Sequence, residues 1–290
     1  MGKADNYLGL FNTRETAVII WLLIVLAWAI SQKKIRDSLF GLGKVILHKK
    51  ILSVIIATVL YAGLIVFFLS KIGIWQISLI KDTTLWLIGT AFVLLINVNQ
   101  ATQDSGFFRK ILIDNLKFIL VLEFVLNLYT FNLLVELILV PFLFAVIGIG
   151  AYAETKKEYL PVKKMVDFIL SIIGFFLISY AFAKIIGDYQ SIVTSENMRA
   201  FILPPLLTFA YVPFLYLFAL IMAYESLFLR IDFFVKDNKA LAKFAKQKIV
   251  RLCHLNLRKL SRFSRDKTQE LIKISSEEDV KKVIKGFRKG

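Results

Sequence analysis

The feature of this sequence that most limits its fold is a series of apolar segments, each about twenty residues long. The segment from Ile51 to Ser70 contains no charged residue. A helix of about 20 apolar residues crosses the hydrocarbon core of a bilayer, which is about 30 Å thick. The repetition of such segments predicts an all-α, polytopic membrane helix bundle.

Seven spans are predicted, and several begin at recognisable helix signals. Asn12 and Glu15 have the spacing of a capping box, Asp82 is placed as an N-cap, and Pro204 suits a first helical turn. The short segment Asn127 to Asn132 predicts a tight turn between antiparallel helices. The predicted spans are 12–31, 51–70, 82–98, 116–131, 132–152, 165–186 and 204–224.

The basic residues predict how these spans are oriented. The chain has 37 Lys and Arg residues and a net charge of +16. If there are seven spans, 31 of the 37 fall on one side, in the loops 31–50, 99–117 and 153–164 and in the tail 230–290. By the positive-inside rule that side is the cytoplasm, so the N-terminus is expected outside and the C-terminus inside.

The tail from residue 230 to 290 is the largest soluble segment predicted, with 18 basic and 7 acidic residues. Apolar residues recur at helical spacing from Leu241 to Phe263, and basic residues fill much of the remaining face, which predicts one basic amphipathic helix. Leu271 to Ile274 suggests a short strand, and Ser275 with Glu278 suggests a capping box for a last helix.

Three partners fit such a helix. It can lie on the anionic cytoplasmic leaflet, dock a cytosolic protein through its apolar face, or bind nucleic acid, which is disfavoured because no aromatic-rich reading surface accompanies the charge. The candidate contact residues are Lys243, Lys246, Arg251, Leu252, Arg258, Lys259 and Arg262.

Two acidic residues lie inside predicted spans, where ionisable groups are costly. Glu123 and Glu136 stand at similar depth on either side of the predicted turn. They could share a proton or bind a cation. Alternatively, each is structural and meets a hydrogen-bond donor or a basic residue of another span.

Prolines mark the last span and also allow two interpretations. Pro204, Pro205 and Pro213 form either a hinge lining a pathway or a helix start followed by a static kink, and the second is favoured. Asp167, near the start of the sixth span, is expected to be a first-turn acid.

Catalytic and cofactor signatures are not found. With one cysteine and two histidines, an intramolecular disulfide is excluded and a zinc site is disfavoured. No metalloprotease, nucleophile-elbow or phosphate-binding loop motif occurs. We therefore predict neither an enzyme nor a resident cofactor or metal.

Three stretches resemble a family of uncharacterised bacterial integral membrane proteins. These are Thr13 to Leu22, Ile72 to Trp86 and Phe201 to Leu220. The resemblance implies a multi-pass protein of the bacterial inner membrane. The family has no assigned activity, so the resemblance implies no functional residue.

Two functional hypotheses remain. The first is a membrane-anchored interaction module whose basic tail recruits a cytosolic partner or the anionic leaflet, as the membrane component of a bacterial stress or defence system; homo-oligomers are also expected. The second is an ion or solute channel that uses Glu123, Glu136 and the proline-containing span. The almost wholly apolar second and third spans favour the first hypothesis.

Overall fold

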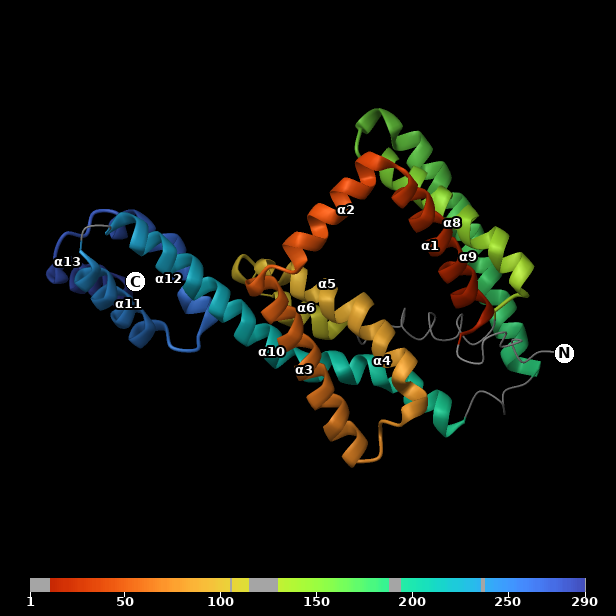
Figure 1. Cartoon of the computed structure of the whole chain (residues 1–290), viewed down its shortest axis with the longest axis horizontal. Helices are drawn as coiled ribbons and strands as arrows, with labels where there is room; N and C mark the ends of the chain where they lie inside the picture. The colour runs from red at the N-terminus through yellow and green to blue at the C-terminus, as the bar shows by residue number, and fades with distance from the viewer. Residues whose placement is uncertain (1–10, 105, 115–129, 188–193, 236–237, 290) are drawn as a thin grey trace. The chain divides into compact units, whose positions relative to one another are not determined.

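The computed structural model describes residues 11–104, 106–114, 130–187, 194–235 and 238–289, and every regular element in these ranges is helical (Figure 1). Six segments of the described chain are long and apolar enough to cross a membrane. They are Thr13–Ser31, Lys49–Lys71, Ile77–Thr102, Leu133–Ala153, Lys157–Lys184 and Ser195–Phe234. The predicted all-helical class is confirmed, and these six segments are compatible with the predicted membrane protein. The predicted span 116–131 falls mostly outside the described residues, so the number seven stays a prediction.

The described helices group into two compact units, each of which is considered by itself. The first contains α1 (Thr13–Ser31), α2 (Lys33–Ile46), α8 (Leu133–Ala153) and α9 (Leu160–Gly187), with the beginning of α3 (Lys49–Lys71). The second contains most of α3, the segment from Asp82 to α6, the greater part of α10 (Ser195–Phe234) and the tail helices.

In the first unit, α8 packs between α1 and α9 (Figure 1). A Cβ added at Gly150 of α8 would lie 2.9 Å from Cγ1 of Val166 in α9, so only glycine permits this approach. The predicted capping box of α1 is confirmed, because Asn12 and Glu15 exchange hydrogen bonds of 2.8 Å between side chain and backbone.

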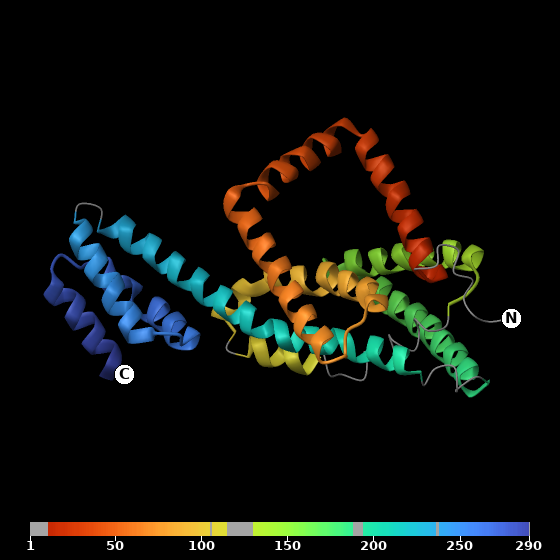
Figure 2. The ribbon, with the colours of Figure 1, turned by 60° about the horizontal axis from the view of Figure 1, so that its bottom comes forward.

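Two predictions about the first unit are wrong. The segment 31–50, predicted as a loop, holds the helix α2, which is separated from α1 by Gln32 in an extended conformation (Figure 2). Asp167 is not in a first turn, because α9 already begins at Leu160 after the 3₁₀ turn η4 (Lys157–Tyr159). Instead, Asp167 accepts a hydrogen bond of 2.7 Å from Lys163, one turn earlier.

The third apolar segment of the chain consists of several short helices. These are η1 (Ile77–Leu79), α4 (Ile80–Trp86), the π-helical turn η2 (Leu87–Ala91), α5 (Phe92–Ile96) and the 3₁₀ turn η3 (Asn97–Thr102), followed by α6 (Phe107–Asp114). Asp82 lies in the first turn of α4 and is not the N-cap, because η1 already begins at Ile77. The predicted end near Val98 is extended by η3 to Thr102.

The core of the second unit is aromatic. Tyr211 of α10 is fully buried, with its ring 5.6 Å from Trp86 and 6.3 Å from Tyr61. Phe214 stacks on Tyr61 at 5.0 Å, so α3, α4 and α10 meet around one cluster of rings. Aromatic pairs at these separations contribute about 0.5–1.5 kcal/mol beyond their buried area.

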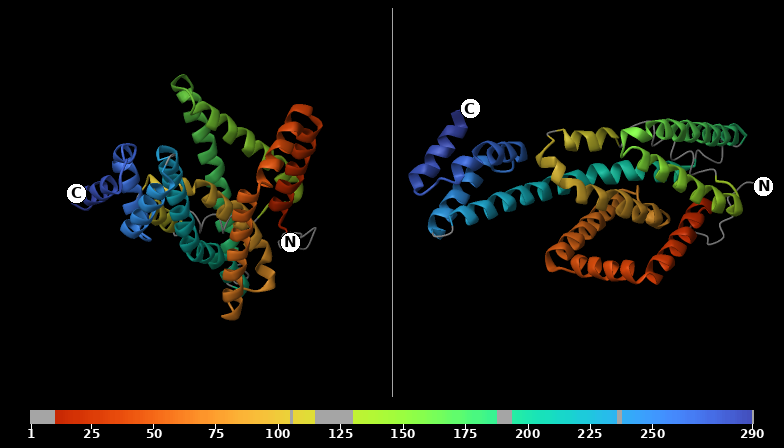
Figure 3. Two further views of the ribbon diagram at one scale, coloured as in Figure 1. Left: turned by 60° about the vertical axis from the view of Figure 1, so that its left-hand side comes forward. Right: turned by 90° about the horizontal axis from the view of Figure 1, so that it is seen from above.

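The tail is a small bundle of three helices, α11 (Lys239–Cys253), α12 (Leu257–Leu271) and α13 (Glu277–Lys289), drawn in blue in Figure 3. The predicted single helix from Leu241 to Phe263 is therefore wrong, since the chain turns at residues 254–256. The apolar stripe is buried between the three helices. Its buried members are Leu241, Ala242, Ala245, Ile249, Leu252, Cys253, Leu257, Leu260, Phe263, Leu271, Ile274, Val280, Val283 and Phe287.

Two smaller predictions about the tail are also wrong. Leu271 to Ile274 is the end of α12 and a turn, not a strand. The capping box of α13 lies one residue further on than predicted, between Ser276 and Asp279, where each side chain bonds the backbone N–H of the other. Hydrogen bonds from the Ser276 hydroxyl and the Ser275 backbone hold the pKa of Asp279 below its usual range.

Candidate functional site

Glu136, the predicted intramembrane acid that the structure describes, is fully buried in the first turn of α8. Its carboxylate is bound by the guanidinium of Arg14 in α1, with Nε to Oε2 and Nη2 to Oε1 both at 3.1 Å. The backbone N–H of Phe131 donates a third hydrogen bond of 3.0 Å to Oε1. The carboxylate is thus neutralised and hydrogen-bonded in place.

Neighbouring side chains complete a polar end to the first unit. The hydroxyl of Thr13 donates to the carbonyl oxygen of Phe131 at 2.6 Å and lies 2.6 Å from the hydroxyl of Thr130. Glu15 pairs with Lys81 at 3.2 Å. The threonine contacts join the start of α1 to the residues that precede α8, and the Glu15–Lys81 pair joins α1 to α4. Glu123 lies outside the described residues, so its predicted proximity to Glu136 stays a prediction.

The three prolines of α10 all lie within one continuous helix of 40 residues. The prediction that Pro204 opens the helix is wrong, since α10 begins nine residues earlier at Ser195. Side chains support this stretch. Trp86 Nε1 donates to the hydroxyl of Thr208 at 2.9 Å, that hydroxyl donates to the carbonyl of Pro204 at 2.9 Å, and Tyr61 bonds the carbonyl of Ala210 at 3.2 Å. These bonds tie α3 and α4 to α10 beside the prolines, whereas the carbonyls that lose a helical donor are those of Ala200, Phe201 and Phe209, four residues before each proline.

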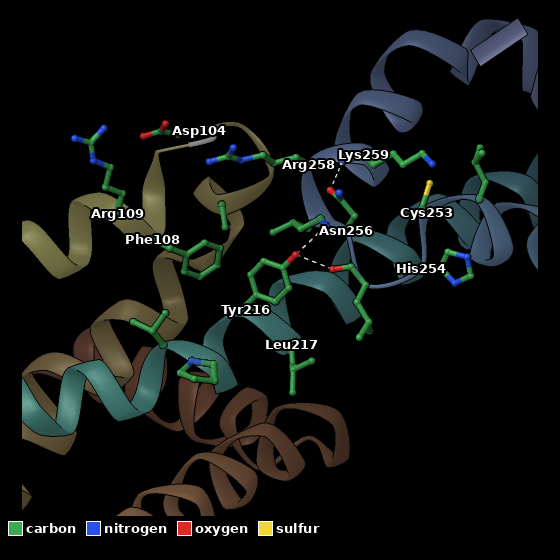
Figure 4. Close-up of a pocket in the computed structure, with 16 residues that line it drawn as sticks. Asp104, Phe108, Arg109, Tyr216, Leu217, Cys253, His254, Asn256, Arg258 and Lys259 are labelled. Carbon is green, nitrogen blue, oxygen red and sulfur yellow. Dashed lines mark hydrogen bonds between the residues drawn. The ribbon is translucent and has the colours of Figure 1, made fainter. Parts of the chain in front are cut away.

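The tail is attached to α10 at the turn between α11 and α12. The hydroxyl of Tyr216 donates to the carbonyl of Leu255 at 2.7 Å and accepts from the N–H of Leu257 at 3.1 Å (Figure 4). Tyr224, two turns along α10, donates to the carbonyl of His254 at 2.7 Å. The turn is also where His254 adopts a φ of 46°, a conformation that side chains with a Cβ rarely take.

A groove of about 1080 Å³ lies at this attachment, between α10, the segment around α6 and the turn of the tail (Figure 4). Its wall is apolar on the α10 side, where Pro213 and Leu217 contribute, and Phe108 packs 5.4 Å from the ring of Tyr216. Its charged lining is mainly basic, with Arg109, Arg258 and Lys259 against Asp104. The polar residues are Asp104, Arg109, Tyr216, His254, Asn256, Arg258 and Lys259.

The structure separates the predicted contact residues of the tail into three groups. Leu252 is only 3% exposed, so it is not offered to a membrane or a partner. Lys246 is occupied within the chain by Asp232, at 2.6 Å, and by the ring of Phe228. Lys243, Arg251, Arg258 and Arg262 are exposed and Lys259 is half-buried; of these, Arg258 and Lys259 line the groove.

Two residues that contact these sites from distant parts of the sequence, Arg14 and Tyr216, were not predicted as site residues. Arg14 lies in the first turn of an apolar helix, and nothing in its sequence context identifies Glu136 as its partner. Nothing in the sequence indicates that Tyr216 binds the turn of the tail. No pattern in the sequence predicted the groove.

Within the described ranges, no group of three or more His, Cys, Asp or Glu residues is placed to hold a metal ion. Arg109, Arg258 and Lys259 give the lining of the groove a basic character, which is suited to anionic groups. No family model, curated protein or solved structure matches this chain.

Proposed function

We propose that this protein is a membrane-anchored recruitment module, in which the folded tail and the basic groove beside it bind an acidic segment of a cytosolic protein. The setting that we propose is the bacterial inner membrane, with seven spans, the N-terminus outside and the tail in the cytoplasm. A stress or defence system is a role that such an arrangement would serve.

The observation that carries this proposal is that apolar residues fill the core of the tail while basic residues dominate its charged residues. Most of its apolar side chains are buried in its own core, and the tail as a whole is strongly basic, with 18 Lys and Arg against 7 Asp and Glu. An exposed surface of this charge attracts acidic partners and raises their rate of association.

The groove adds a defined shape to the positive charge, and shape is needed to select one partner among acidic proteins. It combines an apolar wall with Arg109, Arg258 and Lys259, so it suits a peptide that carries both acidic and apolar side chains. The tyrosine hydrogen bonds hold the turn of the tail against α10, so this groove has a defined form.

Glu136 does not favour the channel hypothesis. A carboxylate bound by Arg14 and by a backbone N–H serves as a fixed ion pair between helices, which supports a structural role. We therefore do not propose a proton or cation site at Glu136 as a second function.

The recruitment proposal is tested by photo-crosslinking in cells, with a photoreactive amino acid in place of Leu255, which lines the groove and is exposed. We expect one predominant adduct with a cytosolic protein. The double substitution Arg109→Glu with Arg258→Glu should abolish it. The matched control, Lys282→Glu with Lys285→Glu, makes the same charge change on α13, away from the groove, and should retain it. Adducts with lipid alone would overturn the proposal.

Orientation has its own test. Single cysteines introduced at Asn6 and Ser275 should be labelled from opposite sides of the membrane by an impermeant maleimide. Labelling of both from the same side would contradict the seven-span arrangement.

A further inference from the structure

Helix α2 carries an apolar stripe that the described chain leaves largely exposed. Ile35, Leu39, Leu42 and Ile46 recur at the spacing i, i+4, i+7 and i+11, which places them on one face. Of these, Leu42 is 58% exposed, and α2 has no buried residue. A stripe of this kind needs an apolar environment from outside the chain.

Basic residues border the same stripe. Lys33, Lys34, Arg36 and Lys44 are exposed, and Asp37 is the one acidic residue within the helix, so α2 has a net charge of +3. With about 100° of rotation per residue, Lys34 and Arg36 flank the stripe on its two sides, and Lys33 and Lys44 lie opposite it. This is the arrangement of helices that lie in the interface of an anionic membrane.

The connections of α2 fix where the helix must lie. It is joined to α1 by the single residue Gln32 and to α3 by Leu47 and His48, and α1 and α3 are both candidate spans (Figure 2). One or two residues reach at most about 3.6 Å each, so both ends of α2 stay close to the ends of the spans. Consecutive spans end at the same surface, so α2 lies along that surface.

The composition of α2 also requires a supporting surface. It has 14 residues, two of them glycines, and isolated helices of this length are marginal in water even for better helix formers. Binding of the stripe at an interface supplies the missing stabilisation.

We propose that α2 is an interfacial helix, whose apolar stripe enters the boundary between lipid headgroups and acyl chains while its lysines and Arg36 bind anionic phospholipid headgroups. The inference rests on α1 and α3 spanning the membrane. It is independent of what the tail recruits, since tail and α2 are tested with separate variants.

The test measures the depth of two neighbouring positions in the full chain. Leu42→Cys and Gly41→Cys are made in a Cys253→Ala background, labelled with an environment-sensitive fluorophore and reconstituted in nanodiscs. A Cβ at Gly41 meets nothing within 4 Å, so this control is sterically neutral. With the fluorophore at position 42 we expect blue-shifted emission that brominated lipids quench. With the fluorophore at position 41 we expect the emission of a water-exposed fluorophore, which brominated lipids do not quench.

Each alternative gives a different result and overturns the proposal. Aqueous emission at Leu42 would mean that the stripe stays in water. Blue-shifted emission without lipid quenching would mean that a protein surface covers it. Binding to anionic headgroups has its own test. Quenching at Leu42 should be stronger with phosphatidylglycerol present than in phosphatidylcholine alone. The triple variant Lys33→Gln, Lys34→Gln and Arg36→Gln should remove this difference. Equal quenching in both lipids would refute headgroup binding.

Discussion

The guanidinium of Arg14 and the carboxylate of Glu136 bind each other through two contacts of 3.1 Å, although the two residues are 122 positions apart in the chain. Glu136 has no exposure and Arg14 keeps 22% of its side chain exposed. The pair closes the polar end of the first unit and fixes α1 against α8.

Loss of one partner should destabilise this packing. We expect Glu136→Gln to lower the free energy of unfolding by roughly 2–3 kcal/mol, below the cost for a fully buried pair because Arg14 is partly solvated. Unfolding by denaturant in detergent micelles measures this. The control Glu158→Gln changes an exposed acid and should have little effect. Adding Arg14→Met to Glu136→Gln should cost less than the two single changes summed; full additivity would show that the pair does not couple.

Two leucines of the tail, three residues apart, should respond differently to the same substitution. Leu252 is 3% exposed and Leu255 is 68% exposed. Leu252→Asp places a carboxylate in the core of the three-helix tail and should cost about 3 kcal/mol or more. Limited proteolysis should then cut between residues 239 and 289, whereas Leu255→Asp should stay as resistant as the parent chain. Equal resistance of both variants would contradict a folded tail core.

His254 should be better replaced by glycine than by any residue with a Cβ. Its φ of 46° costs a side-chain-bearing residue about 1–3 kcal/mol, and glycine adopts this region freely. We expect His254→Gly to raise the midpoint of unfolding and His254→Val to lower it. The reverse order would mean that the turn has a different backbone conformation.

Cys253, the one cysteine of the chain, should be a poorly reactive thiol. Burial raises its pKa from 9.0 to about 11, so the thiolate that reacts with maleimide is scarce at neutral pH. Labelling should be much slower than at an introduced Ser275→Cys, which is exposed. Rapid labelling of Cys253 in the folded chain would contradict its burial.

The same shift predicts how the stability of the tail depends on pH. Because the folded-state pKa lies above the ordinary value, the unfolded chain releases the proton first as the pH rises. The contribution of Cys253 is thus fully present below about pH 9 and is lost between about pH 9 and 11. A Cys253→Ala variant should lack this part of the pH dependence in denaturant unfolding.

The sequence predicted the parts of the fold that depend on local patterns. The capping box at Asn12 needs only residues three apart, and the apolar segments follow from the thickness of a bilayer. Helix α2 was missed because its glycines and charges resemble a loop. The break at residues 254–256 was missed because neither glycine nor proline marks it.

Sites formed by residues that are far apart in the sequence could not be predicted from the sequence. The identity of the partner of Glu136 depends on how α1 meets α8, and the groove depends on Tyr216 binding the backbone of a turn some 40 positions later. A pattern of hydrophobicity predicts which face of a helix is buried but not against which helix. The candidate acid Glu136 was therefore found from sequence, and its pairing was not.

The uninterrupted length of α10 has a mechanical consequence. At about 1.5 Å per residue, its 40 residues extend roughly 60 Å, about twice the hydrocarbon thickness that the helix has to cross. The end of α10 and the tail form one connected piece, because Tyr216, Tyr224 and the ion pair of Asp232 join them. A bilayer that thins or thickens changes the tilt of a spanning helix. If α10 spans the bilayer, a change in its tilt would therefore move the tail and its groove together.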